Sequence, residues 1–303
     1  MSGLRIFYSP AYVAQDLPRL RRLTLAAAQL ERQGLADVYA PDPIDPELLR
    51  QLHSASYVQD FMDGTNPLAS SQGVRWTLEA RDSALAMLGG QLEAARHAFE
   101  HGLAMNMACG FHHAAPDHGG GFCAFNGLAL IAQQYPGKRI FVLDCDEHGG
   151  NGTEAFTALQ PNLYNVSIFG TRFGCLGAER SWGFQVRTAE QGFDAYLQAL
   201  ESAEELVRVH RPDLVLYQAG VDCHQDDPKA TVALSTRQLF ERDLRVFCMT
   251  RRLQVPVLFV AAGGYQSAEK SAQLHMNTVR AALDVYFSDP EVCASIAERV
   301  AML

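Results

Sequence analysis

Two kinds of segment alternate along the chain: short runs that are almost entirely apolar, and longer segments in which apolar residues recur every three or four positions. The short runs predict strands at residues 5–9, 103–109, 138–144, 163–168, 213–218 and 256–262. The longer segments predict helices at residues 17–33, 78–101, 124–134, 191–210, 235–252 and 270–287, and two helical pieces within residues 46–62. This alternation is typical of an α/β protein.

The predicted strands are apolar throughout instead of alternating, which indicates a sheet that helices cover on both faces. Glycine-containing loops interrupt the pattern at residues 63–73 and from residue 168 to about residue 188. No linker, internal repeat or low-complexity tract divides the chain. We therefore expect a single three-layer, doubly wound domain over residues 1–303, with a mostly parallel sheet.

Composition and charge narrow the classes of partner. Hydrophobic residues make up 48% of the 303 residues and charged residues 19%, so the chain can bury a sizeable core. A formal net charge of -9 argues against binding to nucleic acid or to an anionic membrane, whereas a basic peptide would meet less resistance. The sequence has no signal-peptide pattern and no apolar run of about 18 residues, so we expect a cytoplasmic protein with no membrane span. The oligomeric state stays open.

The seven cysteines are scattered, and Cys109, Cys145 and Cys248 lie in apolar runs. This placement favours buried thiols over disulfides. Because the sequence contains no Cys-x-x-Cys pair, a zinc cage of thiolates is not expected.

Polar motifs follow four of the predicted strands, and the carboxyl ends of parallel strands meet at one edge of a sheet. These motifs contain His112 and His113; Asp144, Asp146 and His148; Asp222; and Gly263, Gly264 and Tyr265. Asp146, His148 and Asp222 would give a metal three ligands of the nitrogen and oxygen type that zinc accepts, with room for water and substrate. An Asp-x-His pair alone is also common at solvated strand ends. Only the convergence of the motifs makes a metal site the better interpretation.

The motifs resemble those of the zinc-dependent histone deacetylase family, which shares its fold with arginases and includes acetylpolyamine amidohydrolases and acetoin-utilisation proteins. They read GFHHA at residues 110–114, GGGFCAFN at 119–126, DCDEHGGNG at 144–152, AGVD at 219–222 and GGYQ at 263–266. The resemblance extends over residues 5–287 and implies an arginase/deacetylase-like fold. The short chain, Asn151 and the GGYQ motif are most similar to the class IV branch.

The resemblance implies a role for each matching residue. Asp146, His148 and Asp222 match the zinc ligands. Fe²⁺ is the alternative metal for this site. His113 matches the proton shuttle, His112 its neighbour, Asp144 the carboxylate that orients His112, and Tyr265 the donor to the oxyanion. Many relatives carry a second Asp where this chain has Asn151. Because a neutral partner stabilises an imidazolium less, we predict a lower pKa for His113 than an Asp would give.

The resemblance also implies a narrow tunnel for a lysine side chain. Gly121 and Phe122 match one wall of this tunnel, Gly263 is another tunnel residue, and either Phe173 or Phe169 would form the opposite wall. Lys229 falls where many relatives carry Leu and polyamine-selective relatives carry an acid, although it could equally point into solvent. Asp144 and Ser167 resemble part of a structural potassium site.

We expect a zinc-dependent hydrolase that removes acetyl or longer acyl groups from the ε-amine of lysine in proteins or peptides. An acetylpolyamine amidohydrolase acting on small acylated amines is the alternative, disfavoured because Lys229 would repel a second ammonium by about 1 kcal/mol. A non-catalytic module that binds acyl-lysine or acetate would not need both a shuttle and an oxyanion donor.

Overall fold

Eight parallel strands form one sheet in the computed structural model, which describes residues 3–288 and 290–302. Their order across the sheet is β2-β1-β3-β8-β7-β4-β5-β6. The strands are β1 (Leu4–Phe7), β2 (Ala36–Tyr39), β3 (Leu103–Asn106), β4 (Ile140–Asp144), β5 (Leu163–Phe169), β6 (Ser181–Gln185), β7 (Leu214–Gln218) and β8 (Val257–Val260).

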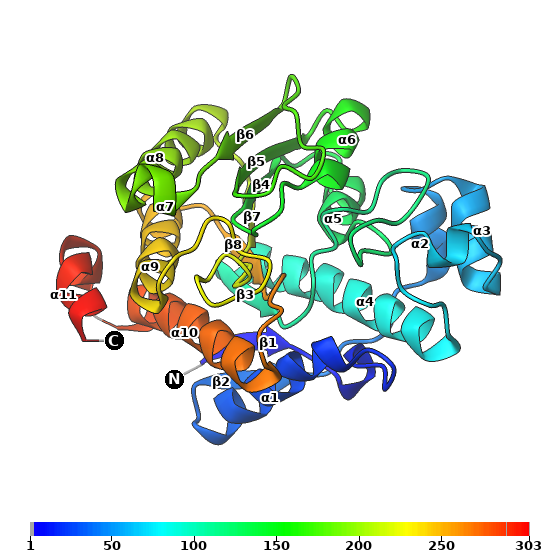
Figure 1. Cartoon of the computed structure of the whole chain (residues 1–303), viewed down its shortest axis with the longest axis horizontal. Coiled ribbons are helices and arrows are strands. Elements are labelled where there is room, and N and C mark those ends of the chain that lie inside the picture. Colours follow the sequence, from blue (N-terminus) through cyan, green and yellow to red (C-terminus); the bar gives the residue numbers. More distant parts are fainter. Residues whose placement is uncertain (1–2, 289, 303) are drawn as a thin grey trace.

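Helices cover both faces of the sheet, as Figure 1 shows, so the predicted three-layer α/β architecture is confirmed. Helices α1, α8, α9 and α10 pack on one another in one layer, and α4, α5 and α6 form the other. The helices are α1 (Arg21–Arg32), α2 (Pro46–Arg50), α3 (Ala55–Asp63), α4 (Leu78–His101), α5 (Gly127–Gln134), α6 (Asn151–Leu159), α7 (Thr188–Gln191), α8 (Phe193–His210), α9 (Thr236–Arg252), α10 (Ala268–Phe287) and α11 (Ile296–Ala301). Short 3-10 helices are η1 (Pro10–Tyr12), η2 (Pro18–Leu20), η3 (Leu68–Ser70) and η4 (Pro290–Ala294). None of the described helices is both long and apolar enough to cross a lipid bilayer.

Helices α4 and α9 begin at residues with clear capping chemistry, and α4 also ends at one. The Thr77 hydroxyl accepts a hydrogen bond from the N–H of Ala80 at the start of α4, and Gly102 ends the helix with a positive φ of 87°. Ser235 and Gln238 form a reciprocal capping box at the start of α9. Because these signals are local, α4 has the bounds expected from the sequence.

Several elements were not expected. The segment from residue 168 to about residue 188 was predicted to be irregular, and this prediction was wrong where β6 pairs with β5. Both β2 and β6 lie at the edges of the sheet, are half exposed and lack the continuous apolar run of the central strands. Helix α6 was also missed because it follows two glycines and contains Gly152.

The four central strands are wholly buried and place their carboxyl ends side by side. In the strand register Asn106 lies opposite Val260, Val260 opposite Gln218, and Gln218 opposite Asp144. The polar motifs that follow β3, β8, β7 and β4 therefore begin at the same edge of the sheet.

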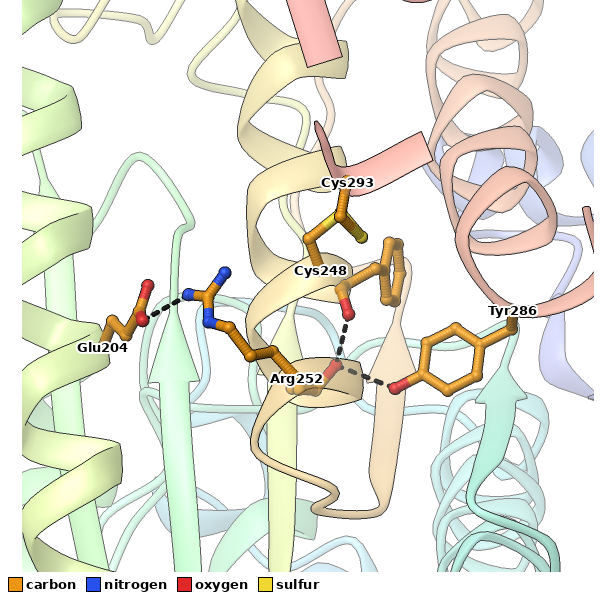
Figure 2. The surroundings of a disulfide bond; sticks show 7 residues. Glu204, Cys248, Arg252, Tyr286 and Cys293 are labelled. Carbon is orange, nitrogen blue, oxygen red and sulfur yellow. Dashed lines mark hydrogen bonds and ion pairs between the residues drawn. A yellow bond between two sulfur atoms is a disulfide. The ribbon is translucent and has the colours of Figure 1, made fainter. Parts of the chain in front are cut away.

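Cys248 on α9 and Cys293 on η4 form a disulfide, with their Cα atoms 5.5 Å apart. The prediction of a free, buried thiol at Cys248 was therefore wrong. The partner lies 45 residues away in a segment that gave no strong pattern, so the pairing could not be read from spacing. Figure 2 shows the bond joining α9 to the C-terminal segment, beside an ion pair between Arg252 and Glu204 of α8. The other five cysteines are free, and all of them except Cys109 are buried.

Candidate active site

Asp146, His148 and Asp222 meet at the edge formed by the central strands. Each offers one ligand atom, and these atoms all lie within 4.8 Å of one another. Nδ1 of His148 is 3.3 Å from Oδ1 of Asp146 and 3.3 Å from Oδ2 of Asp222. Asp146 and His148 follow β4, and Asp222 follows its neighbour β7.

The surroundings of this cluster fit a bound cation. Asp222 is fully buried, and its Oδ2 accepts no hydrogen bond from the described residues. Such an acceptor requires an explanation, and a divalent ion shared with the buried carboxylate of Asp146 and with His148 supplies one. A Cβ at Gly263 would lie 2.2 Å from Asp222 Oδ2 and 2.6 Å from Asp146 Oδ2, so this position requires glycine. Two carboxylates and an imidazole are a donor set that zinc accepts.

Two adjacent histidines follow β3, and their rings lie 3.9 Å apart between centroids. Nδ1 of His112 donates to Oδ2 of Asp144 at 2.6 Å, and Nδ1 of His113 donates to Oδ1 of Asn151 at 2.7 Å. Because a carboxylate or amide oxygen only accepts, the proton of each neutral ring sits on Nδ1. Nε2 of His113 is then left as the base.

The two histidines have opposite protonation tendencies although both are buried. Burial by itself lowers the pKa of His112, but the carboxylates of Asp144 and Asp146 outweigh it and raise this pKa to about 8. Burial lowers the pKa of His113 well below its usual value, and the neighbouring His112 lowers it further. The bond to Asn151 opposes this shift without reversing it. His113 is therefore neutral near pH 7 and can take a proton.

Tyr265 follows β8 and is held by its backbone, since its N–H donates to Oδ2 of Asp227 at 2.7 Å. Its ring lies 6.3 Å from that of His148. Burial, assisted by the carboxylates of Asp222 and Asp146, raises the pKa of Tyr265 well above its usual value. The hydroxyl therefore stays protonated and available as a hydrogen-bond donor.

Aromatic rings from two segments flank these groups. The ring of Phe173 lies 4.1 Å from that of His113, and the ring of Phe122 lies 6.2 Å from that of Tyr265. Gly121 packs on His113 so closely that a Cβ would come within 2.2 Å of its ring. Of the two expected wall residues, Phe173 is at the site and 44% exposed, whereas Phe169 is 2% exposed and belongs to the core.

Glu154, which the sequence analysis did not single out, holds the loop that carries Phe173. Its carboxylate accepts hydrogen bonds from the N–H groups of Leu176 and Gly177 and from the hydroxyl of Ser181, each at 2.9 Å. Glu154 lies one helical turn beyond Asn151 on α6. A helix predicted to begin at residue 151 would have placed Glu154 on the same face as Asn151 and so pointed to Glu154.

Two cations flank the ring of Phe122. Nζ of Lys229 lies 5.8 Å from its centroid and 5.1 Å from that of Tyr265, so this side chain stands at the site. The guanidinium carbon of Arg19 lies 4.2 Å from the centroid of Phe122. No local pattern pointed to Arg19, because about a hundred residues separate it from the ring that it covers.

A pocket with a cavity volume of about 70 Å³ adjoins the site. His112, Asp146, Gly263 and Tyr265 are among the residues that line it. The rest is mainly apolar and includes Leu17, Leu20, Phe61, Val74, Met87 and Phe111. Sequence reasoning missed this lining, because most of it comes from segments outside the motifs.

Asp144 and Ser167 lie opposite each other on the paired strands β4 and β5. The hydroxyl of Ser167 accepts from the N–H of Gly150 at 3.2 Å, and Gly150 is packed against Oδ2 of Asp144. The two residues expected to bind potassium are therefore neighbours.

Comparisons with known proteins fit this geometry. The profile of the histone deacetylase domain matches residues 17–281. The chain belongs to the histone deacetylase family. It is 32% identical to an uncharacterized protein of Picosynechococcus sp., over 94% of this chain and 100% of the relative. It is 25% identical to acetylpolyamine amidohydrolase 1 of Pseudomonas aeruginosa, over 80% of this chain and 85% of the relative.

The fold of this histone deacetylase domain is similar to a crystal structure of acetylpolyamine aminohydrolase from Burkholderia pseudomallei. The TM-score is 0.74 at 19% sequence identity, and the match covers 93% of this chain and 99% of the other. Identity this low supports the arginase/deacetylase-like fold alone.

Proposed function

We propose that this chain is a metal-dependent amidohydrolase that removes acetyl or longer acyl groups from the ε-amine of lysine in proteins or peptides. The observation that carries the proposal is one sheet edge that combines the cluster of Asp146, His148 and Asp222 with His113 and Tyr265. These three cluster residues would hold zinc, with Fe²⁺ as the alternative; when bound, the ion polarises the amide carbonyl and lowers the pKa of water to roughly 7.

The protein groups supply the proton transfers. Nε2 of His113 takes a proton from the attacking water and later gives one to the leaving amine, while Asn151 holds the ring through Nδ1. His112 lies beside His113, and the carboxylate of Asp144 balances the charge that the His112 imidazole carries. The hydroxyl of Tyr265 donates to the oxygen on which negative charge develops. The carbon–nitrogen bond then breaks, and a carboxylic acid and a free amine leave.

The walls of the site favour a long, unbranched substrate side chain. The rings of Phe122 and Phe173 suit a methylene chain. The mainly apolar lining of the pocket that adjoins the site supports acyl groups longer than acetyl. Lys229 disfavours a substrate with a second ammonium, since its own ammonium stands over the rings of Phe122 and Tyr265.

The alternative function is acetylpolyamine hydrolysis, which the name of the Pseudomonas relative supports at 25% identity. Small acylated amines would then be the substrates. A non-catalytic module for acyl-lysine or acetate is less well supported, because binding alone needs neither a neutral His113 nor a protonated Tyr265. We also propose a structural potassium ion beside Asp144 and Ser167, testable by the potassium dependence of thermal unfolding.

Turnover by zinc-loaded protein should be compared on acetyl-, medium-chain and long-chain acyl-lysine peptides and on acetylated putrescine and spermidine. We expect the lysine peptides to be hydrolysed faster. Faster turnover of the polyamines would instead establish the alternative. Asp222→Asn is the matched control, which should lose bound metal and activity together.

A further inference from the structure

Arg242 of α9 is a fully buried cation with no part in the proposed reaction. Its Nη1 donates to two backbone carbonyls, at 3.1 Å to that of Cys145 and at 2.8 Å to that of Gly220. Cys145 directly precedes Asp146, and Gly220 lies two residues before Asp222. One guanidinium therefore joins the two chain segments that deliver the carboxylates of the metal site.

The charge of Arg242 is balanced locally. Its Nε donates to Oδ1 of Asp243 at 2.9 Å. The same carboxylate accepts from the hydroxyl of Tyr217 at 2.5 Å and from that of Thr278 at 2.7 Å. A wholly buried ion pair is costly to desolvate and is weak evidence for stability in itself. The hydrogen bonds of Arg242 to carbonyl groups near Asp146 and Asp222 indicate instead that it orders this part of the site.

We propose that Arg242 is a positioning residue for the metal site. It ties the segments after β4 and β7 together, so that Asp146 and Asp222 keep their spacing before a metal binds. Two buried carboxylates repel each other, and a site fixed in advance loses less free energy to ordering on binding. The inference rests on the metal site of the proposed function.

Zinc dissociation constants of the whole chain, measured by chelator competition, test the role. Arg242→Lys keeps a buried cation but loses the planar guanidinium, whose Nε bonds Asp243 while its Nη1 bonds both carbonyls. We expect zinc affinity to fall about 10- to 100-fold. The absorption spectrum of the cobalt-substituted protein should change as well. Arg245→Lys is the matched control, because Arg245 lies on the same helix, is partly exposed and pairs with Glu241. It should bind both metals as the wild type does.

A merely structural role would lower the unfolding temperature of the metal-free variant but leave zinc affinity and the cobalt spectrum unchanged, and that result would overturn the proposal. If Arg242→Lys does not fold, Tyr217→Phe decides, since it removes one hold on Asp243. Unchanged zinc affinity in that variant would likewise count against the role. Wild-type protein that binds no zinc would refute the metal site itself, so the two failures are distinguishable.

Discussion

Replacing Asn151 with Asp should raise the pKa of His113 and shift the pH range of activity. The two neighbouring histidines provide an internal comparison: His112 bonds a carboxylate and has a pKa of about 8, whereas His113 bonds an amide and has a lowered pKa. Unit charges about 4 Å apart attract by about 4 kcal/mol at an effective dielectric constant of about 20, or about 3 pKa units. Burial of the new carboxylate offsets part of this, so we expect a rise of about 1–3 units.

The sign of the effect on activity follows from the proposed role of His113 as a base. A higher pKa leaves more of it protonated at low pH, so the acid limb of the kcat/KM profile should move to higher pH by the same amount. Besides residue 151, the ionisable groups facing His113 are His112, Asp146 and His148, which the substitution leaves in place. Gln198→Glu, on the solvent side of α8, adds the same charge elsewhere and is the control. An unmoved acid limb, together with an unchanged imidazole titration by NMR, would refute the reasoning.

Three further outcomes are expected. Tyr265→Phe should lower kcat by about 10²- to 10³-fold with little change in KM, because the lost bond forms with the developing oxyanion. Glu154→Gln should raise KM for acyl-lysine peptides about fivefold with kcat retained, because the new amide NH2 group cannot accept from the N–H groups of the Phe173 loop. Exposed Glu179→Gln is its control. Lys229→Glu should shift the kcat/KM ratio of acetylspermidine to acetyl-lysine peptide about tenfold toward the polyamine. Steady-state kinetics checks all three, and an unchanged KM in Glu154→Gln or an unchanged ratio in Lys229→Glu would contradict the assigned contact.

The sheet and its polar edge could be predicted because their signals are local. The central strands are continuous apolar runs, and each chemical motif directly follows one of them. The long helix α4 carries caps at both ends. Convergence of His112, Asp146 and Asp222 then follows from parallel strand ends alone.

The features that could not be predicted depend on contacts between distant segments. The ring of Phe122 meets Arg19 only after folding, and Arg242 reaches Cys145 from about a hundred residues away. The disulfide of Cys248 joins two segments whose proximity no periodicity encodes. Edge strands such as β2 gain their pairing from a neighbour instead of from their own apolar residues.

The first turn of α6 couples basicity to substrate fit. Asn151 sets the tautomer of His113, the proposed base, and Glu154 anchors the loop whose Phe173 ring lies against that imidazole. An inhibitor that displaces the Phe173 ring would therefore change the proton affinity of His113. Its potency would vary with pH even if it carried no ionisable group. Directed evolution of this enzyme would find acid tolerance and affinity for the substrate side chain linked within four consecutive codons.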